Sequence, residues 1–228
     1  MLSKLFKARV SKFLEAPVGL LARSGLSPNA LTIVGFVLNV VVGIVLAMGW
    51  VFAGGFLVLF AGLFDMLDGA TARLSGRTTR FGALLDSVVD RFSEAAILAG
   101  LLWLFLSQER HLEVLLVFAV LLGSLMVSYV RARAEGLGLD CDVGLVARPE
   151  RVLLMAAGLI FSQMVPVLAL LVVFTHLTVV QRVWHVWQLA GLQDLSGSTD
   201  NDSGADAVMD TPHERTGRQK RPTMRKMA

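Results

Sequence analysis

The sequence predicts an all-α integral membrane protein with six transmembrane helices and an N-terminal interfacial amphipathic helix. Of its 228 residues, 55% are hydrophobic and only 17% are charged, which is too apolar for a chain whose surface faces water. Residues 24–64 and 152–181 contain no Asp, Glu, Lys or Arg, so both stretches can enter a bilayer without moving a formal charge. The single cysteine, Cys141, excludes an intramolecular disulfide. A soluble enzyme and a disordered chain are therefore excluded.

The helices follow from the lengths of the uncharged stretches and from the turn residues between them. At about 1.5 Å per residue, residues 24–64 would extend roughly 60 Å, twice the hydrocarbon core, so this stretch must cross the membrane and return. Gly49 marks the turn between the first two helices. The predicted spans are 29–48, 51–73, 82–106, 112–133, 149–163 and 165–190.

The loop charges set the orientation and the domain boundaries. With six spans, the basic residues before the first helix, between the second and third and between the fourth and fifth all face one compartment. The positive-inside rule then places both termini in the cytoplasm, for a multi-pass protein of the plasma membrane. Residues 1–22 alternate basic and apolar positions and are expected to form the interfacial helix, although a solvated basic leader fits them equally well. The membrane domain is predicted at 23–191 and a disordered polar and basic tail at 192–228.

Four aspartates lie on two neighbouring predicted spans. Asp65 and Asp68 are three residues apart and Asp86 and Asp90 are four apart, so each pair shares one face of its helix. The two pairs lie at matching distances from the connecting loop. An acidic residue near the bilayer centre costs about 2.5–3.5 kcal/mol, so four of them indicate a function. An all-oxygen set suits Mg²⁺, Mn²⁺ or Ca²⁺ in a two-metal site for displacement at phosphorus, but a cation or proton pathway through a transporter fits the helical geometry equally well.

The spacing of these aspartates resembles a family signature. The segment from Asp65 to Asp90 matches D-x2-D-G-x2-A-R-x8-G-x3-D-x3-D at every defining position, as in the CDP-alcohol phosphatidyltransferases. Those enzymes are six-helix membrane proteins, usually dimers, in which an acceptor hydroxyl displaces CMP from a CDP-linked lipid or alcohol. The resemblance implies two Mg²⁺ ions per active site, with Mn²⁺ possible, and Asp90 as general base. The implied metal ligands are Asp65, Asp68, Asp86 and Asp90. The implied CDP-lipid-binding residues are Asn29, Thr32, Asp68, Gly69, Ala72 and Arg73.

The acceptor is inferred from the second half of the chain. Arg148 and Arg151 flank a helix start at Pro149, where free N–H groups and the positive end of the helix dipole suit a phosphate. Arg182 interrupts an otherwise uncharged span and should have an anionic partner. This half of the chain is similar to the prokaryotic phosphatidylinositol-phosphate synthases and the related archaetidylinositol-phosphate synthases. The residues that the resemblance assigns to the phosphate of inositol phosphate are Ser128, Arg131, Arg148, Arg151 and Arg182.

The predicted reaction is transfer of a phosphatidyl group from CDP-diacylglycerol, or its archaeal ether analogue, to inositol phosphate. The products are phosphatidylinositol phosphate and CMP. A homodimer among membrane lipids is expected, without a nucleic-acid partner. Two alternatives stay open, namely the same chemistry with glycerol 3-phosphate as acceptor, and a divalent-cation transporter. The transporter predicts a cation-dependent flux and no CMP.

Overall fold

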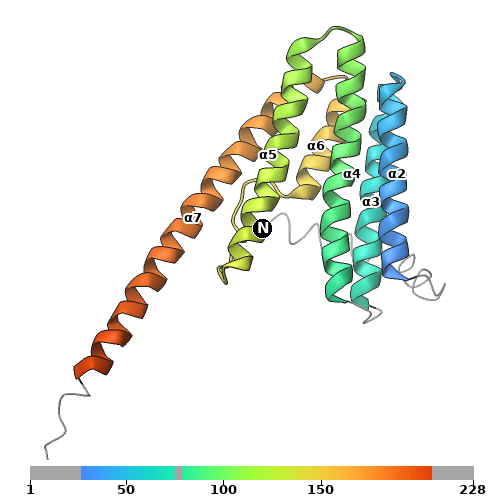
Figure 1. Cartoon of the computed structure of the whole chain (residues 1–228). Helices are drawn as coiled ribbons and strands as arrows, with labels where there is room; N and C mark the ends of the chain where they lie inside the picture. The colour runs from blue at the N-terminus through green and yellow to red at the C-terminus, as the bar shows by residue number, and fades with distance from the viewer. Residues whose placement is uncertain (1–26, 75–78, 207–228) are drawn as a thin grey trace, which may run out of the picture. The chain divides into compact units, whose positions relative to one another are not determined.

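The computed structural model describes the backbone of residues 27–74 and 79–206 and the side chains of residues 27, 29–65 and 79–191. This part of the chain contains α-helices and loops and no strand, which confirms the all-α prediction. The predicted interfacial helix at 1–22 lies outside the described residues. The helices are α2 (Pro28–Ala47), α3 (Val51–Leu74), α4 (Arg80–Ser107), α5 (His111–Gly136), α6 (Arg148–Ile160) and α7 (Met164–Asp206) (Figure 1).

Local sequence signals set the helix starts. The hydroxyl of Ser27 caps α2 by accepting a backbone N–H three residues later, at 3.2 Å, and Thr79 caps α4 in the same way at 2.9 Å. At the start of α6, the carboxylate of Glu150 accepts the N–H of Ala147 at 2.7 Å. Pro149 lies in the first turn, where its missing N–H leaves no helical hydrogen bond unmade. The α6 start therefore agrees with the predicted one.

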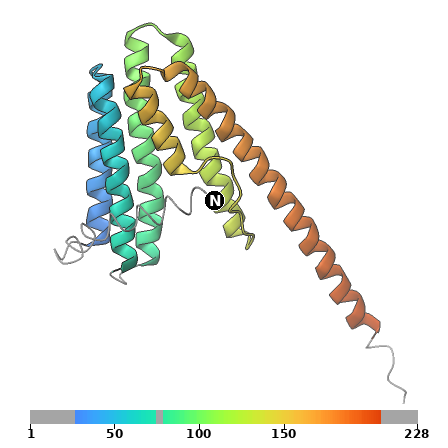
Figure 2. The same ribbon diagram turned by 180° about the vertical axis from the view of Figure 1, so that it is seen from behind.

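The helices α2 to α6 and the first part of α7 share one hydrophobic core. Helix α2 packs against both α3 and α4, α3 packs against α6, and α4 packs against α5 (Figures 1 and 2). A Cβ atom on Gly100 of α4 would collide with the backbone of Gly43 of α2, so glycine is required for this close approach of two membrane helices. Fully buried core residues from each helix include Leu46, Val58, Leu98, Val120, Leu159 and Leu168.

Three helical segments are long and apolar enough to cross a membrane, and the chain is a membrane protein. They are Asn29–Ala47, His111–Gly136 and Met164–Gly191. Helix α3 adds the shorter apolar segment Val51–Asp65. Helix α6 has 13 residues, which at 1.5 Å per residue is about 20 Å, less than the roughly 30 Å hydrocarbon core. Length and composition therefore give three candidate spans, and a bundle of six membrane-crossing helices stays a prediction.

The last helix differs from the sequence prediction at its C-terminal end. Residues 192–206 continue α7, whereas the sequence predicts a disordered tail from residue 192. An existing helix grows by one hydrogen bond per added residue, while a new helix needs a costly nucleus. Polar composition alone therefore does not end a helix that begins upstream. Residues 207–228 lie outside the described residues.

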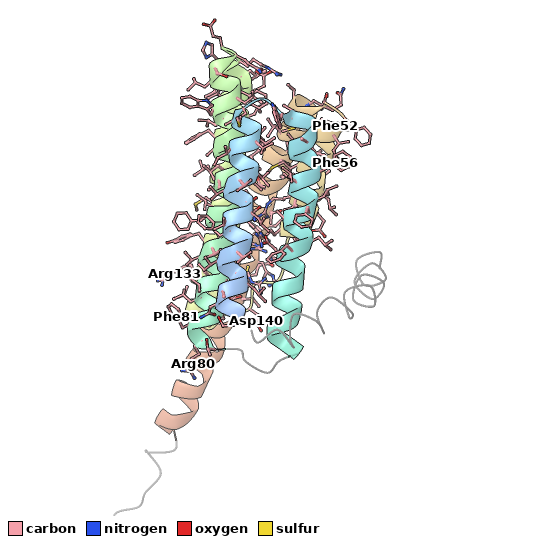
Figure 3. The ribbon with its side chains drawn as sticks, turned by 90° about the vertical axis from the view of Figure 1, so that its right-hand side faces the viewer. Phe52, Phe56, Arg80, Phe81, Arg133 and Asp140 are labelled. Carbon is pink, nitrogen blue, oxygen red and sulfur yellow. The ribbon has the colours of Figure 1, made fainter. Side chains whose placement is uncertain are left out.

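Basic side chains mark one end of the bundle. Arg80 at the start of α4 and Arg133 near the end of α5 lie toward the same end, and Phe52 and Phe56 of α3 lie toward the other (Figure 3). The two phenylalanine rings contact each other edge to face, with centroids 5.1 Å apart. Which side of the membrane the basic end faces stays a prediction.

Candidate active site

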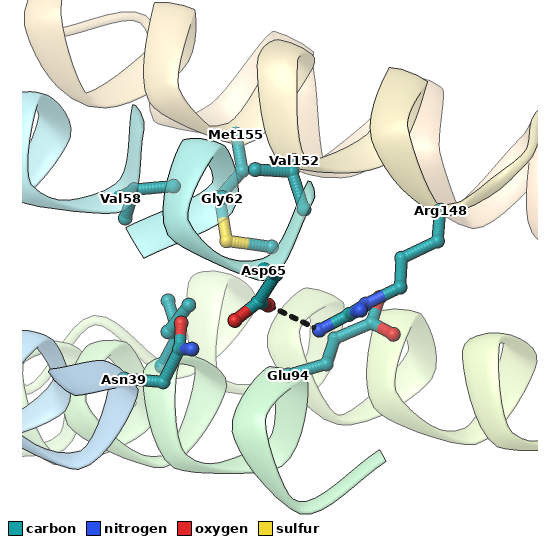
Figure 4. Close-up of a pocket in the computed structure, with 9 residues that line it drawn as sticks. Asn39, Val58, Gly62, Asp65, Glu94, Arg148, Val152 and Met155 are labelled. Carbon is teal, nitrogen blue, oxygen red and sulfur yellow. Dashed lines mark hydrogen bonds and ion pairs between the residues drawn. The ribbon is translucent and has the colours of Figure 1, made fainter. Parts of the chain in front are cut away.

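Two of the predicted aspartates converge on one arginine inside the bundle. Arg148, at the start of α6, donates Nη2 to Oδ2 of Asp65 at 2.7 Å (Figure 4). Its Nη1 donates to Oδ1 of Asp90. Asp86 is exposed and lies close enough to act electrostatically on both carboxylates. Asp65 of α3 and Asp90 of α4 therefore meet at one guanidinium group, and the convergence of all four aspartates stays a prediction.

The donor chemistry at this point fits a divalent cation. The carboxylates of Asp65 and Asp90 already share one positive group, the guanidinium of Arg148. Hard divalent cations prefer such oxygen ligands. Within the described residues, no group of three His, Cys, Asp or Glu side chains is placed to hold a metal. The side chains of the predicted site residues from Asp68 to Arg73, which include Gly69 and Ala72, lie outside the described residues.

Helix α2 fixes the place of Asp65. Asn39 is 3% exposed, donates Nδ2 to the carbonyl of Gly35 at 2.9 Å, and lies beside the side chain of Asp65. A Cβ atom on Gly35 would lie 2.8 Å from Oδ1 of Asp65, so a larger residue at this position would force the carboxylate to shift. Neither residue is among those predicted from the sequence. The available signal is the polar Asn39 in an uncharged span, one turn after a glycine.

A second, buried ion pair lies beside the first. Arg151 donates Nε and Nη2 to the two carboxylate oxygens of Glu94, each at 2.9 Å, and the two side chains are 4% and 10% exposed. Glu94 follows Asp90 by four residues on α4, and Arg151 follows Arg148 by three residues on α6. The ion pairs Asp90–Arg148 and Glu94–Arg151 therefore lie one helical turn apart between the two helices. Glu94 is not among the residues predicted from the sequence, although its spacing from Asp90 places both acids on one face of α4.

Arg148 and Glu94, one member of each ion pair, line a small cavity of about 20 Å³ (Figure 4), which is room for about one water molecule. Polar residues line one side of the cavity and apolar residues line the other. The polar side comprises Asn39, Asp65, Glu94 and Arg148, and the apolar side comprises Val58, Gly62, Ile97, Val152 and Met155. The acids therefore lie against a hydrophobic wall, where their mutual repulsion is poorly screened by solvent.

Arg182 of α7 is held by backbone carbonyl groups. It is 9% exposed, donates Nε to the carbonyl of Val143 at 2.8 Å, and donates Nη1 to the carbonyl of Val127 at 2.5 Å. Four residues earlier, the hydroxyl of Thr178 accepts the N–H of Leu145 at 3.3 Å. These contacts join α5, α7 and the loop at residues 137–147. The anionic partner predicted for Arg182 is thus replaced by two neutral oxygens.

The remaining predicted residues lie near the same end of the bundle. Arg131 of α5 forms ion pairs with Glu135 and Asp142, each at 2.8 Å, and all three side chains are exposed. Ser128, one turn earlier, is partly buried. At the start of α2, Thr32 is 9% exposed. Oδ1 of Asn29 is 3.1 Å from the position that a Cβ on Gly82 would occupy, which places Asn29 beside the start of α4.

The sequence is similar to proteins of known activity. Residues 26–190 match the sequence profile of the CDP-alcohol phosphatidyltransferases. The chain is 42% identical over 205 residues to a phosphatidylinositol phosphate synthase from Mycobacterium marinum, and the match covers 85% of this chain and 86% of that protein.

Two crystal structures of Mycobacterium tuberculosis phosphatidylinositol phosphate synthase are similar to this fold. One, with CDP-DAG bound, has a TM-score of 0.72 at 37% identity and covers 77% of this chain and 94% of its own. The other, in complex with manganese and citrate, has a TM-score of 0.71 at 38% identity and covers 76% of this chain and 88% of its own.

Proposed function

This chain belongs to the CDP-alcohol phosphatidyltransferase family, and on that premise we propose that it transfers a phosphatidyl group from CDP-diacylglycerol to inositol phosphate, giving phosphatidylinositol phosphate and CMP. The observation that carries the proposal is the convergence of Asp65 and Asp90 on one positive group. The similarity to phosphatidylinositol phosphate synthases, one of them solved with CDP-DAG, supports the choice of donor and acceptor.

The enzyme uses a divalent cation, and we propose two Mg²⁺ ions per active site, with Mn²⁺ as a substitute. The proposed ligands are Asp65, Asp68, Asp86 and Asp90. When bound, the ions neutralise the diphosphate and stabilise the oxygen that leaves with CMP. The manganese complex of the related synthase supports this assignment.

The chain's own residues position the donor and move the proton. Asp90 accepts the proton of the attacking inositol phosphate hydroxyl, whose oxygen bonds to the phosphorus that carries diacylglycerol. The bond from that phosphorus to the bridging oxygen of the diphosphate breaks, and CMP leaves. Catalysis of this kind depends mainly on positioning and charge neutralisation. The proposed donor-binding residues are Asn29, Thr32, Asp68, Gly69, Ala72 and Arg73.

The proposed group for the acceptor phosphate lies on α5, α6 and α7. It comprises Ser128, Arg131, Arg148, Arg151 and Arg182. Arg182 supports this proposal most directly, because its hydrogen bonds to neutral carbonyls satisfy the guanidinium without cancelling its charge.

The proposed topology has six membrane-crossing helices, with both termini in the cytoplasm and the enzyme in the plasma membrane as a homodimer. The basic residues at one end of the bundle support this orientation. A site near that end takes its lipid donor from the bilayer and its phosphorylated acceptor from water.

The proposal is tested by CMP release from the purified chain in detergent with Mg²⁺ and CDP-diacylglycerol. Inositol phosphate, glycerol 3-phosphate, free inositol and serine are added singly. We expect release with inositol phosphate alone and its loss when EDTA removes the cation. Release only with glycerol 3-phosphate would keep the aspartate site and overturn the acceptor assignment. No release with any acceptor would overturn the proposed reaction.

A further inference from the structure

Glu94 joins three helices beside the proposed active site. Both of its carboxylate oxygens accept hydrogen bonds from Arg151 of α6, and Ser124 of α5 lies beside its side chain. Both the acid and Ser124 are buried, at 9% and 3% exposure. A buried ion pair carries a desolvation penalty that packed apolar side chains would avoid, so stability alone explains it poorly. Its position suggests a role in the geometry of the site.

The bidentate pair constrains the first turn of α6. Two parallel hydrogen bonds fix the orientation as well as the distance of a guanidinium. Arg148 lies one turn before Arg151 on the same face of α6 and reaches Asp65 and Asp90 from there. A shift of Arg151 would therefore move the backbone that carries Arg148.

We propose that Glu94 is a positioning residue that acts through Arg151 to hold the first turn of α6, and with it Arg148, against the catalytic aspartates. This inference rests on the proposed function and changes one assignment within it. Arg151 supports acceptor use through its bidentate pair with Glu94 and does not itself contact the acceptor phosphate.

The kinetic test compares Glu94→Gln, Arg151→Met and the double variant. We expect each single change to lower kcat for CMP release about tenfold to a hundredfold, because a misplaced catalytic group loses rate. The KM for inositol phosphate should change less than about threefold, because no direct contact with the acceptor is lost. The double variant should be no worse than the worse single one, because both changes break the same link. Arg151→Lys, which retains the charge, should recover part of kcat.

The matched control is Glu113→Gln. Glu113 pairs with Arg110 at 2.6 Å in the first turn of α5, so the substitution removes a similar ion pair away from the aspartates. Its kinetics should equal those of the unaltered enzyme.

The structural readout is hydrogen–deuterium exchange in the peptide spanning residues 148–155. We expect faster exchange there in Glu94→Gln and in Arg151→Met, and no change in Glu113→Gln. If Glu94→Gln does not fold, Ser124→Ala removes only the hydroxyl group beside the carboxylate, and it should give a smaller loss of kcat with the same exchange pattern.

A direct phosphate contact by Arg151 would give a different result. Arg151→Met would then raise the KM for inositol phosphate more than about tenfold at unchanged kcat, while Glu94→Gln would match the unaltered enzyme in kinetics and exchange. That outcome overturns the positioning role. Failure of the proposed function is recognised separately, because the unaltered enzyme would then release no CMP with inositol phosphate, and the exchange comparison would still decide the role of Glu94.

Discussion

The arginines of the site are held in two different ways on two walls. On the acidic wall, formed by α3, α4 and α6, guanidinium groups face carboxylates. Its members are Asp65, Asp90, Glu94, Arg148 and Arg151. On the basic wall, formed by α5, α7 and the loop between α5 and α6, Arg182 donates to backbone carbonyls and Arg131 pairs with exposed acids.

The two walls differ in the charge they leave for a ligand. The acidic wall has three carboxylates for the guanidinium groups of Arg148 and Arg151. Arg91 adds a third guanidinium group 3.6 Å from Asp90, and Asp86 adds a fourth carboxylate beside the wall, so one negative charge remains and the wall favours cations. Arg182 keeps its positive charge because carbonyl oxygens satisfy its donors without neutralising it. A single site can thus hold a metal on one wall and a phosphate on the other, and the two should respond to different substitutions.

Asp90→Asn, a substitution on the acidic wall, should lower CMP release more than any other change considered. The substitution keeps the size of the side chain but removes the proposed proton acceptor and one partner of Arg148. We expect CMP release to fall by about 10² to 10⁴-fold, the range for loss of a general base. The thermal midpoint in detergent should change little, because Asp65 still pairs with Arg148. Turnover near that of the unaltered enzyme would remove Asp90 from the role of base.

The proximity of the two aspartates on the acidic wall could be predicted from the sequence, because the information for it is local. The three- and four-residue spacings place Asp65 and Asp90 on helix faces, and the short connection between α3 and α4 brings those faces together. The helix starts were also predictable, because Ser27 and Pro149 carry capping and first-turn signals. Local spacing and a short hairpin leave few alternative arrangements.

The contacts between distant helices could not be predicted in the same way. The pairing of Glu94 with Arg151 depends on α4 lying beside α6, and 57 residues separate the two side chains. Gly35 matters only because α2 turns it toward Asp65. The rotation of one membrane helix against another depends on close packing of small residues, which an uncharged stretch of apolar sequence specifies weakly.

Arg182→Gln, a substitution on the basic wall, should have an intermediate effect on activity. Glutamine can donate to one of the two carbonyls but carries no charge. We expect the KM for inositol phosphate to rise about tenfold to a hundredfold, because this corresponds to the free energy of one charge-assisted hydrogen bond. The change in kcat should be smaller. Arg182→Lys keeps the positive charge, so its KM for inositol phosphate should lie between those of Arg182→Gln and the unaltered enzyme. If the Mg²⁺ concentration for half-maximal activity changed while the KM for inositol phosphate stayed the same, Arg182 would instead act at the metal.

Gly35→Ala adds one methyl group beside the acidic wall and should have a smaller effect than Arg182→Gln. The new Cβ would lie 2.8 Å from Oδ1 of Asp65, and the carboxylate can rotate away because it is the free end of the side chain. We therefore expect little change in the thermal midpoint, and about a tenfold higher Mg²⁺ concentration for half-maximal activity, as for the loss of a group that orients a metal ligand. Titration of Mn²⁺ by electron paramagnetic resonance measures the same weakening without turnover.

Gly144→Ala is the matched change on the basic wall. Its Cβ would lie 2.8 Å from Cγ2 of Thr178 and 3.6 Å from Nε of Arg182, so the loop must shift away from α7 while the aspartates keep their places. The KM for inositol phosphate should rise a few-fold with the Mn²⁺ titration unchanged, the reverse of the pattern for Gly35→Ala. If both methyl groups shifted the same parameter, metal and phosphate would share one set of contacts, and the division into two walls would be wrong.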